Sequence, residues 1–294
     1  MVKIKVPATT ANLGPGFDSL GCALSLYAEI EFEARETGLL IDGCDPAYQN
    51  EENLMVVAYD KTMERLGLKR KGLYIKFHSD IPICRGLGSS AALIVAGCMA
   101  ANVMHGNRLK QAELLNLCNA IEGHPDNVAP ALYGGLIASL VEENQAYSVA
   151  YPISEEACFC VLIPDFQTST HEARKILPKQ VAFEDAIFNL SRTAVLCHAL
   201  GEWNEELLGI ALKDRLHQPY RSQLIYEYDK VREICLKQGA AAFFISGSGP
   251  TCIALSKYKD FSQRVQNDLK QCQHQWQVLD VKADADGASV MEVE

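Results

Sequence analysis

The sequence predicts a protein of mixed helices and strands that folds as two domains. The chain has 294 residues, which is long for a single hydrophobic core, and 48% of them are hydrophobic, enough for sizeable cores. Stretches in which apolar and polar residues alternate, as in half-buried strands, stand between stretches of helical periodicity. We expect the boundary near Tyr151 and Pro152, so that residues 1–151 form one domain and residues 152–294 the other.

Composition excludes several classes of partner. The net charge of −10, from 27 basic and 37 acidic residues, argues against nucleic acid or an anionic membrane as the main partner. We recognise no signal peptide, and the longest weakly polar run, from Ala91 to Met104, is too short to cross a bilayer. The 11 cysteines include no C-x-x-C pair and mostly stand among apolar residues, as reduced thiols do. We therefore expect a soluble cytoplasmic protein that binds neither nucleic acid nor a membrane.

In the first domain, alternation predicts strands, and periodicity with capping residues predicts helices. The expected strands cover residues 1–7, 24–34 and 72–78, and the expected helices cover residues 54–66, 91–101 and 109–121. Asn53 is a suitable N-cap for the first helix, and Gly67 stops it. Residues 8–21 contain two glycines and a proline close together, so we expect a turn-rich loop.

Apolar runs predict the strands of the second domain, and helical periodicity predicts its helices. The expected strands cover residues 157–163, 240–245 and 252–255, and the expected helices cover residues 172–177, 183–200, 205–212 and 224–236. Between the second and third strands, Ser246–Thr251 is a glycine-containing turn, which favours the close approach of a backbone or a ligand. From Trp276 onward we expect a last short strand and a frayed end.

A glycine loop stands between the strand over residues 72–78 and the helix that follows. In this stretch, PICRGLGSSAA, Gly86 and Gly88 let the backbone turn sharply and approach a ligand, and Ser89 and Ser90 suit an N-cap. Such a loop points unpaired N–H groups and the positive end of a helix dipole at an anion. It is not a P-loop, because no lysine follows the last glycine. The alternatives are a phosphate site and an ordinary glycine turn before a core helix.

Two further polar clusters are candidate sites. Asn12 and Asp18 lie in the turn-rich loop, where they could hold a hydroxyl or an ammonium group or simply cap turns. Residues 122–127, EGHPDN, stand between two apolar segments, and polar groups there are costly unless they are satisfied or used. Glu122 near bound phosphates could hold Mg²⁺. The alternative is a surface turn with an exposed His124.

Arg174 and Arg221 stand at or beside the ends of predicted elements. A guanidinium group there can clamp a carboxylate through two hydrogen bonds. A solvated salt bridge is the alternative for each of them.

Five blocks of the sequence resemble those of a known family. Residues 82–91, with the pattern P-x-x-x-GLGSSA, resemble the ATP loop of the GHMP small-molecule kinases, which include galactokinase, homoserine kinase, mevalonate kinase and phosphomevalonate kinase. Residues 246–250, SGSGP, resemble the third motif of that superfamily. Residues 7–18 (PATTANLGPGFD), 124–130 (HPDNVAP) and 219–223 (PYRSQ) are similar to the homoserine kinases within it.

The resemblance implies an α+β fold of two domains with the site between them. The first domain would be like domain 2 of ribosomal protein S5, and the second would be ferredoxin-like. ATP would lie along the glycine loop, with its phosphates at the helix N-terminus. The residues implied in ATP binding are Pro82, Ile83, Cys84, Arg85, Gly86, Leu87, Gly88, Ser89, Ser90, Ala91 and Ala92.

The resemblance also implies roles for particular side chains. The implied Mg²⁺ ligands are Ser90 and Glu122, the implied catalytic set is Ser90, Glu122 and Asn127, and the implied substrate-binding residues are Asn12, Asp18, His124, Asn127, Arg174 and Arg221. The carboxylate of Asp18 would pair with a substrate ammonium, the two arginines with its carboxylate, and the two asparagines would orient its hydroxyl. Some relatives have the metal-binding glutamate further before the histidine, whereas here Glu122 lies two residues before His124 and Asn116 occupies the earlier position.

The implied activity is ATP-dependent phosphorylation of the side-chain hydroxyl of L-homoserine to O-phospho-L-homoserine and ADP, a step towards threonine. Positioning and charge neutralisation would carry most of the catalysis. Asp126 could act as a base or hold its loop, and we leave it out of the catalytic set. A sister kinase for mevalonate or a sugar, a non-catalytic ligand-binding regulator, and a scaffold protein are the alternatives. A homodimer formed through exposed strand edges is also possible.

Overall fold

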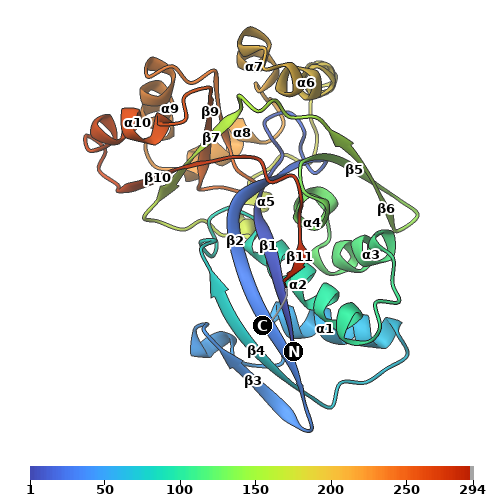
Figure 1. The fold of residues 1–294 in the computed structure, drawn as a ribbon. Coiled ribbons are helices and arrows are strands. Elements are labelled where there is room, and N and C mark those ends of the chain that lie inside the picture. The colour runs from blue at the N-terminus through green and yellow to red at the C-terminus, as the bar shows by residue number, and fades with distance from the viewer. Residues whose placement is uncertain (292–294) are drawn as a thin grey trace.

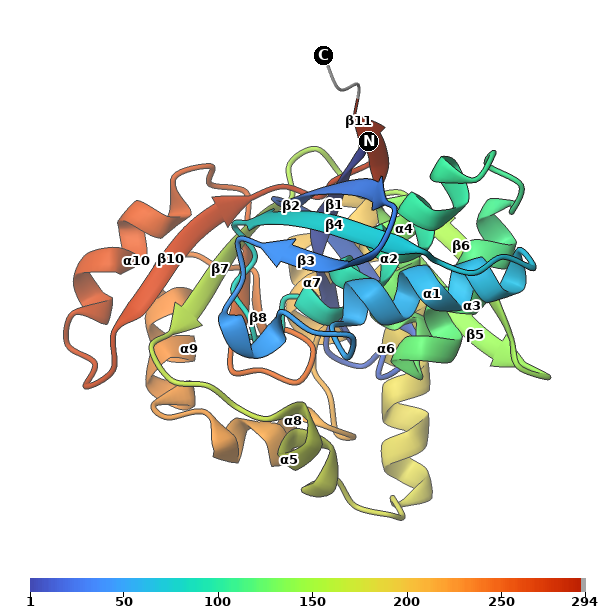
Figure 2. The same ribbon diagram turned by 90° about the horizontal axis from the view of Figure 1, so that it is seen from below.

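The computed structural model describes residues 1–291, which form two β-sheets with helices packed on them (Figures 1 and 2). The first sheet has seven strands, and its central path runs β11-β1-β2-β4-β3, with β5 beside β2 and β6 beside β5. These strands are β1 (Val2–Ala11), β2 (Leu20–Arg35), β3 (Gly38–Asp42), β4 (Gly72–Ser79), β5 (Leu136–Glu142), β6 (Gln145–Tyr151) and β11 (Ser289–Met291). Within residues 1–291, no helix is both long enough and apolar enough to cross a membrane.

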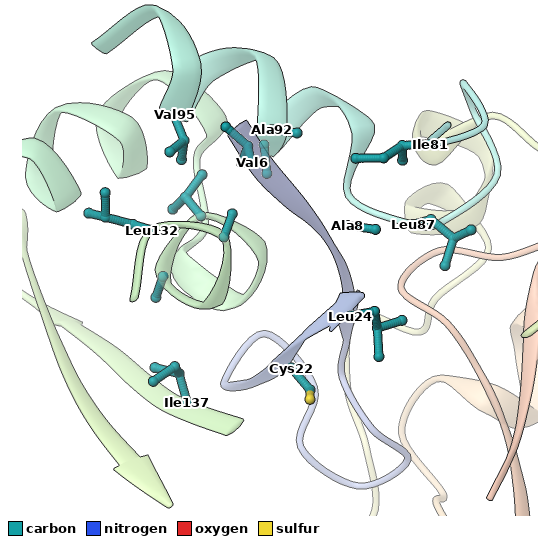
Figure 3. Close-up of a cluster of buried hydrophobic side chains, with 14 of the residues drawn as sticks. Val6, Ala8, Cys22, Leu24, Ile81, Leu87, Ala92, Val95, Leu132 and Ile137 are labelled. Atoms are coloured by element: carbon teal, nitrogen blue, oxygen red, sulfur yellow. The ribbon is translucent and has the colours of Figure 1, made fainter. Parts of the chain in front are cut away.

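Four helices cover one face of the first sheet (Figure 2). They are α1 (Leu54–Arg65), α2 (Ser89–Met104), α3 (Gln111–Glu122) and α4 (Pro125–Tyr133), and a 3₁₀ turn, η1 (Pro46–Tyr48), precedes them. Helix α2 is apolar on most of its surface because it packs against β1, α1, α3 and α4 at once. Figure 3 shows Val6 of β1 beside Ala92 of α2, with Val95 and Leu132 in the same cluster.

The second sheet has four antiparallel strands in the order β10-β7-β9-β8. They are β7 (Cys158–Pro164), β8 (Ala242–Ile245), β9 (Cys252–Ser256) and β10 (Trp276–Val281). The other elements of this half are α5 (Thr170–Lys175), α6 (Phe183–Glu202), α7 (Glu205–Ala211), α8 (Gln218–Arg221), η2 (Ser222–Leu224), α9 (Tyr228–Lys237) and α10 (Phe261–Leu269). Side chains on one face of β7, such as Phe159, join the main core, and those on the other, such as Leu162, join a smaller core with α9 and α10.

Most of the expected helices and strands are present in the structure, with differences at their ends. Helix α1 begins after Asn53, whose Oδ1 accepts a hydrogen bond from the Met55 amide at 2.9 Å. Strand β1 continues to Ala11 instead of ending at Pro7, because after an irregularity at Pro7/Ala8 its last residues still pair with β2. The helix expected over residues 224–236 begins only at Tyr228, since residues 222–224 form the separate turn η2.

The expectation of a frayed end after the strand at Trp276 is wrong for residues 282–291. Ala283 forms a bridge with Leu24, and β11 pairs with β1, so the chain returns to the first sheet (Figure 1). Residues 292–294 of the expected frayed end lie outside the described part of the chain. The expected domain boundary falls between β6 and β7, which belong to different sheets, and it stays a prediction.

Candidate active site

A cavity of about 370 Å³ collects the polar clusters that the sequence singled out. Side chains from both halves of the chain line it, and those expected from the sequence are Asn12, Asp18, Ser90, Glu122, His124, Asn127, Arg174 and Arg221. From the glycine loop, residues 83–86 and 88–90 also line the cavity. Leu87, Ala91 and Ala92 instead lie in the hydrophobic core, of which Figure 3 shows Leu87 and Ala92, and Pro82 is half-buried.

The glycines of the loop are needed for its packing. Gly88 adopts φ +69°, and a Cβ added to it would overlap Thr9 Oγ1. Gly86 adopts φ +73°, and a Cβ there would overlap the Ser246 carbonyl oxygen. Helix α2 begins directly after Gly88, which has no side chain to cap it, so the amides of its first turn remain suited to an anion.

The second glycine-containing turn lies against the first. Ser246 Oγ donates to the Gly86 carbonyl oxygen at 2.6 Å, and the Gly247 amide donates to the Ala11 carbonyl oxygen at 3.1 Å. These bonds join the end of β1, the glycine loop and the turn between β8 and β9. Both turns therefore face one cavity although they belong to different sheets.

The two residues implied as metal ligands are in direct contact. Ser90, in the first turn of α2, donates from Oγ to Oε1 of Glu122, at the end of α3, at 2.6 Å. Burial raises the pKa of the Glu122 carboxyl, and the Ser90 hydrogen bond opposes the rise. One carboxylate and one hydroxyl suit Mg²⁺, which keeps several waters and takes further oxygens from phosphates. Asn116, at the position where some relatives have the glutamate, instead accepts a hydrogen bond from the Ala146 amide at 2.7 Å.

A cluster of charges forms another part of the cavity. The guanidinium of Arg174, on α5, binds the Asp18 carboxylate through two hydrogen bonds of 2.9 and 3.0 Å. Arg221, on α8, is only 2% exposed, so the solvated salt bridge considered for it is wrong. Burial, followed by the charge of nearby Arg174, lowers the pKa of Arg221 to about 10, so it stays positively charged at neutral pH.

The Arg221 side chain is held by backbone oxygens. Its Nε donates to the Ala173 carbonyl at 3.1 Å and one terminal nitrogen to the Gly247 carbonyl at 2.9 Å. The ring of Phe17 lies near this group, with its centroid 5.1 Å from the central guanidinium carbon. These contacts fix one positive charge at the cavity wall.

Asn12 uses both ends of its amide within the protein. Its Nδ2 donates to the Gly247 carbonyl oxygen at 2.9 Å, and its Oδ1 accepts from the Asp18 amide at 3.0 Å. The residue adopts φ +72°, which asparagine tolerates better than most residues. The amide of Asn12 thus positions Asp18 in this structure.

The block HPDN forms the start of α4 rather than a surface turn. Asp126 is 2% exposed, and its Oδ1 lies 2.6 Å from Nδ1 of His124. This hydrogen bond raises the pKa of His124, which favours the imidazolium form. Asn127, in the first turn of α4, accepts at Oδ1 a hydrogen bond of 2.8 Å from Thr9 Oγ1.

Sequence reasoning missed the apolar half of the cavity. It is lined by Cys44, Tyr48, Leu54, Met55, Phe77 and Leu93. These residues come from the β3–α1 connection, α1, β4 and α2, and each looks like an ordinary loop or core residue in its own segment. Only the packing of α1 and α2 against the sheet brings them together. The contact of Thr9 with Asn127 was also missed, because in the sequence Thr9 is one threonine in a turn-rich block.

The sequence matches two family models in separate parts of the chain. Residues 53–135 match the family described as "GHMP kinases N terminal domain", and residues 194–274 match "GHMP kinases C terminal". A homoserine kinase of Clostridium botulinum (strain Kyoto / Type A2) is 44% identical over 292 residues, which cover 99% of this chain and 98% of that protein. A homoserine kinase of Caldicellulosiruptor bescii is 43% identical over 301 aligned positions, covering 100% of this chain and 98% of that protein.

A solved structure gives the same result at the level of the fold. The crystal structure of homoserine kinase from Cytophaga hutchinsonii has a TM-score of 0.88 to this structure at 30% identity, covering 99% of this chain and 97% of that one. The similarity extends over both sheets, and it confirms the two-domain α+β fold of the GHMP kinases that the motifs implied. The chain therefore belongs to the homoserine kinase family of the GHMP kinases.

Proposed function

We propose that this protein transfers the terminal phosphoryl group of ATP to the side-chain hydroxyl of L-homoserine, giving O-phospho-L-homoserine and ADP, a step towards threonine. One observation carries the proposal: a single cavity holds an uncapped helix N-terminus next to a cluster of paired charges. The first suits the phosphates of a nucleotide, and the second suits an amino acid. Membership of the homoserine kinase family supports the same two ligands, a nucleotide and an amino acid.

The charge cluster has the character expected of an amino-acid site. Asp18 and Arg174 present opposite charges side by side, which complement the ammonium and carboxylate groups of a zwitterion. We assign Asp18 to the ammonium group and Arg174, with Arg221, to the carboxylate. His124 and Asn127 line the same cavity, and we assign His124 to substrate binding and Asn127 to the hydroxyl.

The nucleotide would occupy the other half of the cavity. Backbone amides at the start of α2 would bind its phosphates, and the apolar residues of the cavity would receive its base. Ser90 and Glu122 would hold Mg²⁺, which when bound neutralises phosphate charge. The protein's own contribution is to orient the hydroxyl and hold fixed positive charge, because phosphoryl transfer needs little covalent help.

Measuring ADP release tests the function. The purified protein is assayed with ATP and Mg²⁺ against L-homoserine, mevalonate, galactose and no acceptor, and we expect turnover with homoserine alone. The Asp18→Asn variant should raise the KM for homoserine and leave the KM for ATP unchanged, since Asp18 lies on the acceptor side. Turnover with mevalonate or galactose would contradict the assigned acceptor, and ATP binding without any turnover would favour a non-catalytic regulator.

We also propose that the protein acts in the cytoplasm as a homodimer and without nucleic acid. All 11 cysteines lie in the described part of the chain and are free thiols, as in proteins of a reducing compartment.

Strand β6 lies at an edge of the first sheet and exposes Tyr147, Val149 and Tyr151, which a second copy could cover. Sedimentation equilibrium of the purified protein measures the mass of the assembly, and the monomer mass at all concentrations would contradict the dimer.

A further inference from the structure

Thr9 is a fully buried residue of β1 that contacts both sides of the cavity without lining it. On the nucleotide side, its amide donates to the Leu87 carbonyl oxygen of the glycine loop at 3.1 Å. On the acceptor side, its Oγ1 donates to Oδ1 of Asn127 at 2.8 Å. Thr9 therefore connects two parts of the site that come from different elements.

The hydroxyl of Thr9 is fixed in place by its surroundings. A Cβ on Gly88 would overlap Thr9 Oγ1 and would lie 3.2 Å from Asn127 Oδ1, so the hydroxyl fills the space next to the missing side chain of Gly88. As a β-branched residue in a strand, threonine also has few χ1 rotamers to choose from. The hydrogen bond to Asn127 thus comes from a donor with little freedom to turn away.

The direction of that hydrogen bond decides which end of the Asn127 amide serves the substrate. Oδ1 accepts from Thr9, so the Nδ2 group is the end of the amide left for the cavity that Asn127 lines. An NH₂ group donates to a hydroxyl oxygen and cannot accept the hydroxyl proton. Asn12 differs, because both ends of its amide are already used.

We propose that Thr9 is a positioning residue, which orients Asn127 so that its Nδ2 holds the oxygen of the acceptor hydroxyl. This inference rests on the proposed function, because it takes Asn127 to contact that hydroxyl. Asn127 then donates a hydrogen bond that aligns the acceptor hydroxyl, and it does not act as the base that removes the hydroxyl proton. Thr9 also couples the glycine loop to the acceptor site, since this one residue contacts both.

A double-mutant cycle between Thr9 and Asn127 tests the inference. Thr9→Val removes the hydroxyl and keeps the shape, and we expect it to lower kcat about 10-fold, the size of one lost buried hydrogen bond, with the KM for ATP unchanged. Thr9→Ser keeps the donor and should retain most of kcat. In an Asn127→Ala background, Thr9→Val should cause no further loss, because the partner is already absent.

Thr62→Val is the matched control. Thr62 is also fully buried, but its Oγ1 donates to the Ala58 carbonyl oxygen within α1. We expect this variant to lower the thermal transition and leave kcat unchanged. If Thr9→Val does not fold, Thr9→Cys replaces it in the same cycle, since a thiol is a weak donor.

The outcomes separate this inference from the proposed function. The positioning role would be overturned if the two substitutions in the double variant each lowered kcat by their full separate factors. Equal kcat values for Thr9→Val and Thr9→Ser would also overturn it. In both cases homoserine would remain the acceptor. Full turnover by Asn127→Ala would overturn the role assigned to Asn127 and the inference with it. Absence of homoserine turnover in the unmodified protein would contradict the function itself.

Discussion

Glu122 is the residue whose environment bears most directly on the metal. Burial raises the pKa of its carboxyl above the usual 4.5, and the hydroxyl of Ser90 is its hydrogen-bond partner at 2.6 Å. A carboxyl must be deprotonated to bind a metal, so a raised pKa makes binding sensitive to mild acid. Acidification from neutral pH towards that pKa would protonate Glu122 and weaken its hold on Mg²⁺.

Replacing Glu122 by glutamine should lower the maximal rate and raise the Mg²⁺ concentration that is required. In the unmodified protein the required Mg²⁺ concentration should rise as the pH falls, and in Glu122→Gln this dependence should largely disappear. Mg²⁺ titrations of the rate at several pH values measure both effects. Glu113→Gln is the control, because Glu113 lies on the same helix but pairs with Arg65 at the surface. An unchanged Mg²⁺ dependence in Glu122→Gln would rule out Glu122 as a ligand.

At the scale of elements, the site depends on how closely β1 approaches the start of α2. Gly88 ends the glycine loop in a left-handed conformation, and Thr9 of β1 fills the space where its side chain would be. The same loop contacts the β8–β9 turn through the bond from Ser246 to Gly86. Three elements thus meet at glycines, and even one methyl group there would separate them.

Two glycine-to-alanine variants separate backbone strain from loss of space. Gly67 has φ +72° and an open surrounding, while Gly88 has φ +69° and no room for a Cβ. Gly67→Ala should cost about 1 kcal/mol in the free energy of unfolding, which is the left-handed strain alone. Gly88→Ala should cost clearly more and raise the KM for ATP. Urea unfolding and ATP kinetics measure these effects, and equal values for the two variants would show that the contact with Thr9 is unimportant.

At the scale of the whole molecule, the segment after β10 returns to the first sheet, and Asp284 binds it there. Its carboxylate accepts hydrogen bonds from the Tyr27 hydroxyl at 2.8 Å and from the Gly287 amide at 2.7 Å. Its backbone bonds to Ala23 and Gly135, in or beside the first sheet. The segment after β10 therefore ties the second sheet to the first, and we expect it to stabilise the whole protein.

Asp284→Ala should lower the free energy of unfolding by about 2–3 kcal/mol, because it leaves the buried Gly287 amide and the half-buried Tyr27 hydroxyl without their charged acceptor. Asp286→Ala is the control, since Asp286 is exposed and two residues away, and its effect should stay within about 0.5 kcal/mol. Thermal and urea denaturation of both variants give these values. A similar loss in the two variants would mean that the segment contributes no specific interaction through Asp284.

The sequence singled out the polar residues of the candidate site but not the contacts among them. The sequence predicts that Asp18, Arg174 and Arg221 each meet a charge of the substrate, and in the structure all three line the same cavity. Their mutual pairing could not be foreseen, because Arg174 and Asp18 lie 156 positions apart. The apolar half of the cavity carried no signal, since Leu54 and Leu93 look like any buried residues of a helix.

By itself, the sequence determined most of the local structure, the family and the residue types of the candidate site. Capping at Asn53, alternation at the start of β1 and the glycines at positions 86 and 88 depend on neighbours along the chain, so they can be read from it. The tertiary structure alone decided which polar group meets which. The bond from Thr9 to Asn127 spans 118 positions and exists only because β1 and α4 pack in one core. Such contacts follow from close packing in three dimensions, which no local pattern encodes.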